Sequence, residues 1–314
     1  MRFLAEETIA EKRLVKLSVK DKKLIQLLIQ NTRMPVTQLA KKVGISKSAI
    51  VQKIAHLKKK GVLMNPVTYT SVKISEFSFY ACEISTQIGL DYKKITDYLI
   101  KIKEVIAVFW YNGPYNLVLA LHTEDFQETM DKIQEVVEIK KLRIRKCIGN
   151  WLHPPYMFRE VSDKKVEFRR IKPRVDDTDK KILKVLDENP LASIVEISTK
   201  TRLASQTIKK RMNYLEKEGI INGYEYLPNT WLIGKETISI NLIVKGKKET
   251  DNLVKYLLSV PEVGNVWEYD DEWNLNFLLW VDNQFEVNKI INYLTKSFKI
   301  LDYDISVLAA MLGK

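Results

Sequence analysis

The chain has 314 residues, of which 46% are hydrophobic, a length and composition that predict several packed domains and exclude a disordered chain. Its two cysteines, Cys82 and Cys147, lack any paired Cys/His spacing, which excludes a disulfide scaffold or a zinc finger and fits a reducing cytoplasm. The formal net charge is +12, and residues 1–65 alone hold 15 Lys/Arg against 4 Asp/Glu. A basic segment of this kind is typical of a protein that binds the phosphate backbone of nucleic acid.

The N-terminus is charged throughout, so it does not resemble a signal peptide. No apolar stretch approaches the roughly 20 residues that a membrane-spanning helix needs. We therefore expect a cytoplasmic, nucleoid-associated protein with no membrane partner.

The chain repeats itself at an offset of 158 residues. Residues 18–63 align without a gap on residues 176–221, so that Asp21-Lys22-Lys23 falls on Asp179-Lys180-Lys181. A weaker match places 104–122 on 262–280. The repeat predicts five segments: 1–70 and 176–228 as winged helix-turn-helix domains, 71–150 and 229–314 as α+β domains, and 151–175 as a linker rich in Pro and Arg.

The first copy begins with three predicted helices. Ser18 is a good N-cap, with Asp21 three residues on in a capping-box arrangement, and the first helix runs to about Asn31. Apolar residues at helical spacing predict a second short helix over 36–43, which Gly44 ends. Ser46 caps a third helix that stops at Gly61. Residues 62–69 look extended, with a turn at Asn65-Pro66, and predict a β-wing.

A short second helix, a tight turn and a longer third helix are the plan of a helix-turn-helix, whose third helix enters the major groove. Its exposed residues offer donors, acceptors and a methyl surface for base edges, and lysines nearby suit phosphates. The predicted DNA-binding residues of the first copy are Lys41, Lys42, Ser46, Lys47, Ser48, Val51, Gln52, Lys53, Lys58, Lys59 and Lys60.

The second copy is less basic, with 9 Lys/Arg against 9 Asp/Glu over residues 176–226. Glu216 and Glu218 stand where the first copy has Lys58 and Lys60. This copy either binds DNA more weakly or faces a protein. Its candidate DNA-binding residues are Ser205, Gln206, Lys209, Lys210 and Arg211.

Each α+β segment reads as βαββαβ, a ferredoxin-like order. In the first copy the expected strands are 77–84, 105–111, 115–121 and 142–148, with helices over 92–102 and 126–137. In the second copy the strands are 237–244, 263–269, 273–281 and 303–308, with helices over 250–258 and 285–293. The fold class is therefore α+β, with two winged helix-turn-helix domains each followed by a ferredoxin-like domain.

The helix-turn-helix followed by βαββαβ resembles the Lrp/AsnC (feast/famine) family of transcription regulators. The segments that carry the resemblance are DDTDKKILKVLDEN at 176–189, SKSAIVQKIAHLKKKGVL at 46–63 and GPYNLVLAL at 113–121. It implies a sequence-specific regulator of double-stranded DNA that assembles as a homo-dimer or higher oligomer through its α+β domains. It also implies a small-molecule effector site, for which the candidates here are Tyr115, Asn116, Trp273 and Asn274.

The sequence departs from that family at the effector site, where Asn116 replaces the usual aspartate and 270–274 replaces a glycine loop. The interpretation is a regulator that is not an enzyme and has no metal or cofactor, since His56, His122 and His153 lie far apart and no nucleotide or protease motif is present.

Two alternatives stay open. Siroheme decarboxylases are also built from two such units, and the run from Pro114 to Leu117 with His122 is similar to theirs. A polymerase- or protein-binding factor that uses one DNA-binding head is the other alternative.

Overall fold

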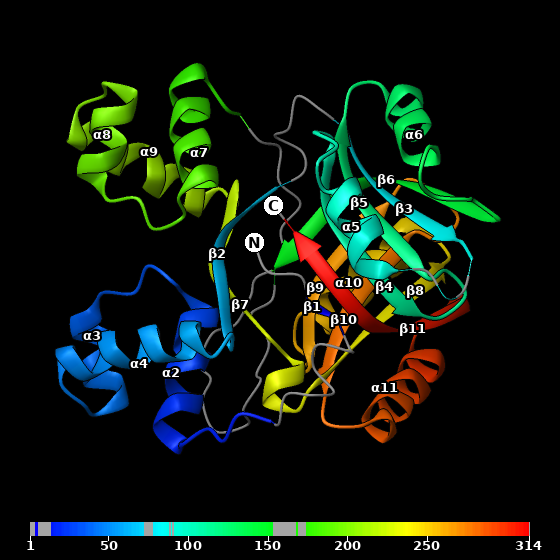
Figure 1. The fold of residues 1–314 in the computed structure, drawn as a ribbon, viewed down its shortest axis with the longest axis horizontal. Helices are drawn as coiled ribbons and strands as arrows, with labels where there is room; N and C mark the ends of the chain where they lie inside the picture. The colour runs from blue at the N-terminus through cyan, green and yellow to red at the C-terminus, as the bar shows by residue number, and fades with distance from the viewer. Residues whose placement is uncertain are drawn as a thin grey trace.

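The structure is a computed structural model that describes residues 4–5, 14–71, 78–87, 89, 91–152, 168 and 174–313. Two three-helix heads lie on one side of the molecule and a large β-structure lies on the other, with the strands β2 and β7 between them (Figure 1). Most of the predicted linker, at 153–167 and 169–173, falls outside the described residues.

The first head contains α2 (Val19–Gln30), α3 (Val36–Val43) and α4 (Lys47–Lys59). The predicted capping box is present: the Ser18 side chain accepts from the Asp21 N–H, and the Asp21 carboxylate accepts from the Ser18 N–H. Gly44 ends α3 in the left-handed conformation, with φ of 75°, which is where glycine costs least. The sequence prediction of these three helices is confirmed.

The second head repeats this plan with α7 (Asp177–Glu188), α8 (Ile194–Thr201) and α9 (Ser205–Lys217). Asp176 and Asp179 form the equivalent capping box. Each head has its own apolar core: Leu24, Ile25, Leu39 and Ile50 are buried in the first, and Ile182, Ile197, Ile208 and Leu215 in the second.

The two heads are joined by a two-stranded antiparallel ribbon of β2 (Leu63–Thr70) and β7 (Ile221–Pro228). The predicted turn at Asn65-Pro66 is wrong, because both residues lie inside β2. The ladder shifts register between Leu63 and Pro66, which accommodates the proline, since its missing N–H cannot donate. The extended segment after α4 thus pairs with the second copy rather than folding back into a hairpin wing.

Side chains of the first head and the ribbon also reach the second head. The Arg33 guanidinium donates to the carbonyl oxygens of Pro190 and Ala192 at 2.7 and 2.9 Å. The Thr68 hydroxyl donates to the Leu186 carbonyl at 2.7 Å. The heads are therefore tied to each other as well as to the ribbon.

Both α+β units follow the predicted βαββαβ order. The first unit has β3 (Ser78–Ser85), α5 (Tyr92–Leu99), β4 (Val105–Asn112), β5 (Leu117–Thr123), α6 (Phe126–Gln134) and β6 (Lys141–Leu152). The second has a 3-10 turn η2 (Trp231–Ile233), β8 (Glu236–Val244), α10 (Lys247–Leu257), β9 (Val263–Tyr269), β10 (Leu275–Val281), α11 (Gln284–Ser297) and β11 (Ile300–Gly313).

The eight strands of the two units close into one ring, which we call the barrel: β11-β4-β5-β3-β6-β9-β10-β8, with β8 pairing back to β11. A short strand β1 (Leu4–Ala5) adds to β11. The last strands β6 and β11 run several residues past their predicted ends, because the extra residues pair with β9 and β4 of the other unit. Figure 1 shows β11 beside β4 of the first unit.

Each unit has an apolar core between its own sheet and its helices. Buried members include Leu99, Val108 and Leu119 in the first unit and Leu253, Phe277 and Leu294 in the second. The opposite sheet faces look into the barrel and carry buried charged and amide side chains, such as Glu83, Arg145 and Asn241, beside a small apolar cluster around Ala81, Cys147 and Tyr269. The two units meet at this inner surface.

Candidate nucleic-acid interface

The outer face of α4 is the first candidate DNA surface. Ser46 caps the helix by accepting from the Ala49 N–H at 3.2 Å, so its hydroxyl has a structural role. Ile50 and Leu57 are buried beneath the helix and fix which face points outward. The face left exposed carries Lys47, Ser48, Val51 and Gln52, with Val51 56% exposed. An exposed valine among polar residues suits contact with a thymine methyl group.

Lysines surround this face, as the sequence predicts. Lys41 and Lys42 lie in the last turn of α3, and Lys58, Lys59 and Lys60 lie at the end of α4, all of them exposed. Lys58 Nζ lies 4.8 Å from the centre of the Tyr226 ring in the ribbon. Among the described residues, none of these five lysines forms a salt bridge, so their charge is available to phosphate.

Lys53 differs from these lysines because it turns back onto its own head. Its Nζ lies 2.6 Å from Asp21 Oδ1, and its side chain is 32% exposed. Burial by itself raises the pKa of the Asp21 carboxyl, but hydrogen bonds from Lys53 and Ser18 outweigh this and hold that pKa below its ordinary value. The expectation that Lys53 points freely outward therefore does not hold.

Arg211, which is equivalent to Lys53 in the second copy, has the same role. Its guanidinium lies 2.5 Å from Asp176 Oδ2 and 3.5 Å from Asp179 Oδ2. In both heads this position ties the recognition helix to the capping box of the first helix. The prediction that Arg211 points outward, free to contact DNA, is therefore wrong as well.

The outer face of α9 is the second candidate DNA surface. Ser205, Gln206, Lys209 and Lys210 are exposed there. The helix begins after Ala204, which provides no side-chain cap, whereas the first copy has Ser46. The two glutamates that replace basic residues, Glu216 and Glu218, are exposed, and Glu216 accepts from the Tyr224 hydroxyl at 2.9 Å.

The candidate effector residues are engaged by the protein itself. Asn116 accepts from the Thr86 N–H at 2.8 Å, and Asn274 accepts from the Val244 N–H at 3.0 Å, so both amides brace equivalent strand ends. Tyr115 and Trp273 cover the Arg143 guanidinium, with ring centres 4.6 and 4.2 Å from it. The structure brings these aromatic side chains together from the two units.

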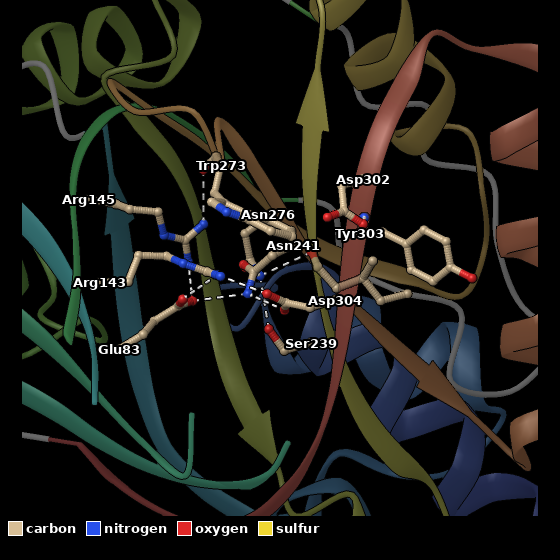
Figure 2. A network of polar contacts seen from close by, with 11 residues as sticks. Glu83, Arg143, Arg145, Ser239, Asn241, Trp273, Asn276, Asp302, Tyr303 and Asp304 are labelled. Atoms are coloured by element: carbon tan, nitrogen blue, oxygen red, sulfur yellow. Dashed lines mark hydrogen bonds and ion pairs between the residues drawn. The ribbon is translucent and has the colours of Figure 1, made fainter. Parts of the chain in front are cut away.

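Arg143 belongs to a polar network inside the barrel (Figure 2). Its Nη1 lies 2.8 Å from Glu83 Oε2 and 2.9 Å from Asp304 Oδ2. Arg145, which is 1% exposed, pairs with Glu83 and donates to the Trp273 carbonyl at 3.2 Å. Asn241 donates to Glu83 at 3.0 Å and to Asp304 at 2.8 Å. Two cations and two anions are thus matched, as burial of charge requires.

Sequence reasoning missed this network, although one signal was present. The sequence of β6 alternates Leu142 and Ile144 with Arg143 and Arg145, so the two arginines share one face of the strand. In the folded protein this arginine face is the buried one, because it lies against carboxylates contributed by both units.

The described residues hold no cluster of three or more His, Cys, Asp or Glu side chains arranged to bind a metal ion. Among the same residues, no helix is long and apolar enough to cross a membrane. Cys82 and Cys147 are free and buried, and burial raises the pKa of each thiol to about 12.

Comparison with known proteins supports the helix-turn-helix assignment. Residues 17–58 match the AsnC-type helix-turn-helix domain, and residues 175–222 match a winged helix-turn-helix DNA-binding domain. The chain is 30% identical over 122 residues to the HTH-type transcriptional regulator FL11 of Pyrococcus horikoshii, which covers 38% of this chain and 78% of that protein. The FL11 of Pyrococcus furiosus is 26% identical over 118 residues, with 38% and 78% covered.

Among solved structures, the siroheme decarboxylase NirDL is similar over nearly the whole chain. The match covers 94% of this chain and 92% of that one, with a TM-score of 0.57 and 12% sequence identity. At this identity the likeness shows the shared tandem fold alone.

The heads and the matched domains define a helix-turn-helix DNA-binding protein. Within that class, the chain belongs to the Lrp/AsnC family of transcriptional regulators, with the family's unit present twice.

Proposed function

We propose that this protein is a single-chain, two-headed regulator that binds double-stranded DNA sequence-specifically, with the first head making the stronger contact. The observation that carries the proposal is the exposed face of α4, where base-reading side chains are bordered by five lysines without salt bridges among the described residues. Phosphate contacts supply affinity and set the register, while base contacts supply specificity.

Within this surface we assign base reading to Lys47, Ser48, Val51 and Gln52, and phosphate binding to Lys41, Lys42, Lys58, Lys59 and Lys60. We assign structural roles to Lys53 and Arg211 because each forms an ion pair with a carboxylate of a capping box. In the second head, Ser205, Gln206, Lys209 and Lys210 form the equivalent face. Its two exposed glutamates oppose phosphate and weaken its contribution.

We also propose that one chain is the working unit. The sheets through which separate α+β domains could associate are already paired within the chain by β6–β9 and β11–β4. The four effector candidates are engaged in bracing strand ends and covering Arg143. We therefore give them a structural function.

The proposal is tested by incubating the intact chain with sheared genomic DNA, recovering bound fragments at moderate salt, and sequencing them. Enrichment of a few discrete sites is expected. Uniform recovery of all fragments would contradict sequence-specific regulation. The matched control is the variant Gln52→Ala, which keeps the lysines and is expected to show weaker enrichment while still retaining DNA.

A second candidate function is suggested by the match to siroheme decarboxylase along the whole chain. That enzyme has been solved with an iron-uroporphyrin III analogue, so the same compound is the appropriate probe. In this chain Asn116 and Tyr115, from the similar strand start, contact Thr86 and Arg143. We expect no visible absorbance band in the purified protein and no spectral change on titration with iron-uroporphyrin. A saturable, stoichiometric spectral change would favour the enzyme.

A further inference from the structure

The ribbon that joins the two heads has a local two-fold rotation axis. Val67 of β2 pairs with Glu225 of β7, and these residues occupy equivalent positions, 158 apart. The flanking hydrogen bonds obey the same relation: Ser71 N donates to Ile220 O at 2.9 Å, and Asn229 N donates to Val62 O at 2.8 Å. An antiparallel pair centred on two equivalent residues has a local two-fold axis through that pair.

The barrel obeys the same relation. Glu83 and Asn241 are equivalent and touch each other at 3.0 Å. In the last strands the offset becomes 161, since Cys147 pairs with Tyr269 and Leu308 pairs with the equivalent Tyr111. With that offset Arg143 is equivalent to Asp304, and the two form an ion pair at 2.9 Å.

The residues on this axis also show that the copies are not interchangeable. If two identical first copies met in this way, Arg143 would face Arg143 and Glu83 would face Glu83, which places like charges together in a buried site. The present pairs, cation with anion and carboxylate with amide, are satisfied only when a first copy meets a second copy. Figure 2 shows the carboxylates of Glu83 and Asp304 converging on Arg143.

A two-fold relation between recognition helices matches the two-fold symmetry of the DNA backbone, so half-sites read by such a pair are inverted relative to each other. The four exposed residues assigned to base reading in each helix differ at every equivalent position. Lys47 corresponds to Ser205, Ser48 to Gln206, Val51 to Lys209 and Gln52 to Lys210. Different side chains prefer different base edges, so a perfect palindrome leaves one head on the wrong sequence.

We propose that the protein recognises a bipartite DNA site whose two half-sites are inverted but unlike in sequence, one read by α4 and the other by α9. Such a site has a direction, and the chain binds it in one orientation only. This inference rests on the proposed function and adds the form of the site.

The experiment is a selection of bound duplexes from a randomised library with the intact chain, followed by titrations on the selected site. Two inverted blocks of different sequence are expected. Palindromes built from either block alone should bind more weakly than the selected site. Two identical inverted blocks, a direct repeat or a single block would overturn the inference while leaving the proposed function standing. Absence of any enriched sequence would overturn the proposed function itself.

Variants then assign each block to a head. Gln52→Ala is expected to reduce discrimination in one block by roughly 5- to 150-fold, and Lys210→Ala to act on the other block alone. The matched controls are Gln127→Ala on α6 and Lys296→Ala on α11, both exposed and distant in the fold, which should leave both blocks unchanged. If both recognition-helix variants affect the same block, the inference is overturned.

Discussion

The carboxyl group of Glu225 is buried where the ribbon crosses the two-fold axis. Replacing it with an uncharged amide, in Glu225→Gln, should change how the stability of the protein depends on pH. The residue is 1% exposed, and its Oε1 has no hydrogen-bond partner among the described residues. Burial raises its pKa from 4.5 to about 8. The pKa of the neighbouring-strand residue Tyr69 is raised in turn by burial and by the Glu225 charge.

Because the folded-state pKa lies above the unfolded one, this carboxyl stabilises the protein fully below pH 4.5, and the stabilisation is lost as pH rises through about 8. Each pH unit between these values costs about 1.4 kcal/mol. From pH 5.5 to 7.5 the wild-type free energy of unfolding should therefore fall by about 2–3 kcal/mol relative to that of Glu225→Gln.

The assay is urea unfolding of both proteins at constant ionic strength, followed by tryptophan fluorescence, at several pH values across this window. Glu218→Gln, on the exposed end of the second head, is the matched control and should run parallel to the wild type. If the Glu225→Gln and wild-type curves are parallel as well, the Glu225 carboxyl titrates normally in the native state and the reasoning is refuted.

Two further substitutions test the packing. Arg143→Met leaves the carboxylates of Glu83 and Asp304 without one of their buried cations and should lower the free energy of unfolding by roughly 3–5 kcal/mol. The measurement is urea unfolding, with the exposed substitution Lys141→Met as the control. Equal losses in both variants would contradict the network's role. Ser18→Ala removes the N-cap hydroxyl of the first capping box and should lower stability by about 1 kcal/mol, seen as a reduced thermal midpoint. A midpoint unchanged from wild type would show that the cap contributes nothing.

The helices of the heads could be predicted because their signals are local. Ser18 with Asp21, Gly44 and Ser46 each act within one turn of the chain, and all three lie where the sequence places them. The βαββαβ order was predictable for the same reason, since period-2 and period-3.6 patterns are read over short windows.

The pairing of the two copies could not be predicted in this way. Nothing local to β2 indicates that it pairs with β7, 158 residues further along the chain, so the sequence alone predicts a turn at Asn65-Pro66. The ends of β6 and β11 were missed because those residues pair with the other unit. Lys53 was predicted as exposed since only the packed head shows Asp21 beside it.

The central claim, that the first head binds DNA, is tested most directly by fluorescence anisotropy on a selected site and on random duplex across a salt series. The wild type should bind both duplexes, with an affinity that falls steeply as salt concentration rises, and it should bind the selected site more tightly than the random duplex. Lys59→Ala should weaken both duplexes alike and reduce the salt slope by about one, whereas Gln52→Ala should cost roughly 1–3 kcal/mol on the selected site alone. Absence of salt-dependent binding by the wild type, or equal losses on both duplexes for Gln52→Ala, would contradict the account.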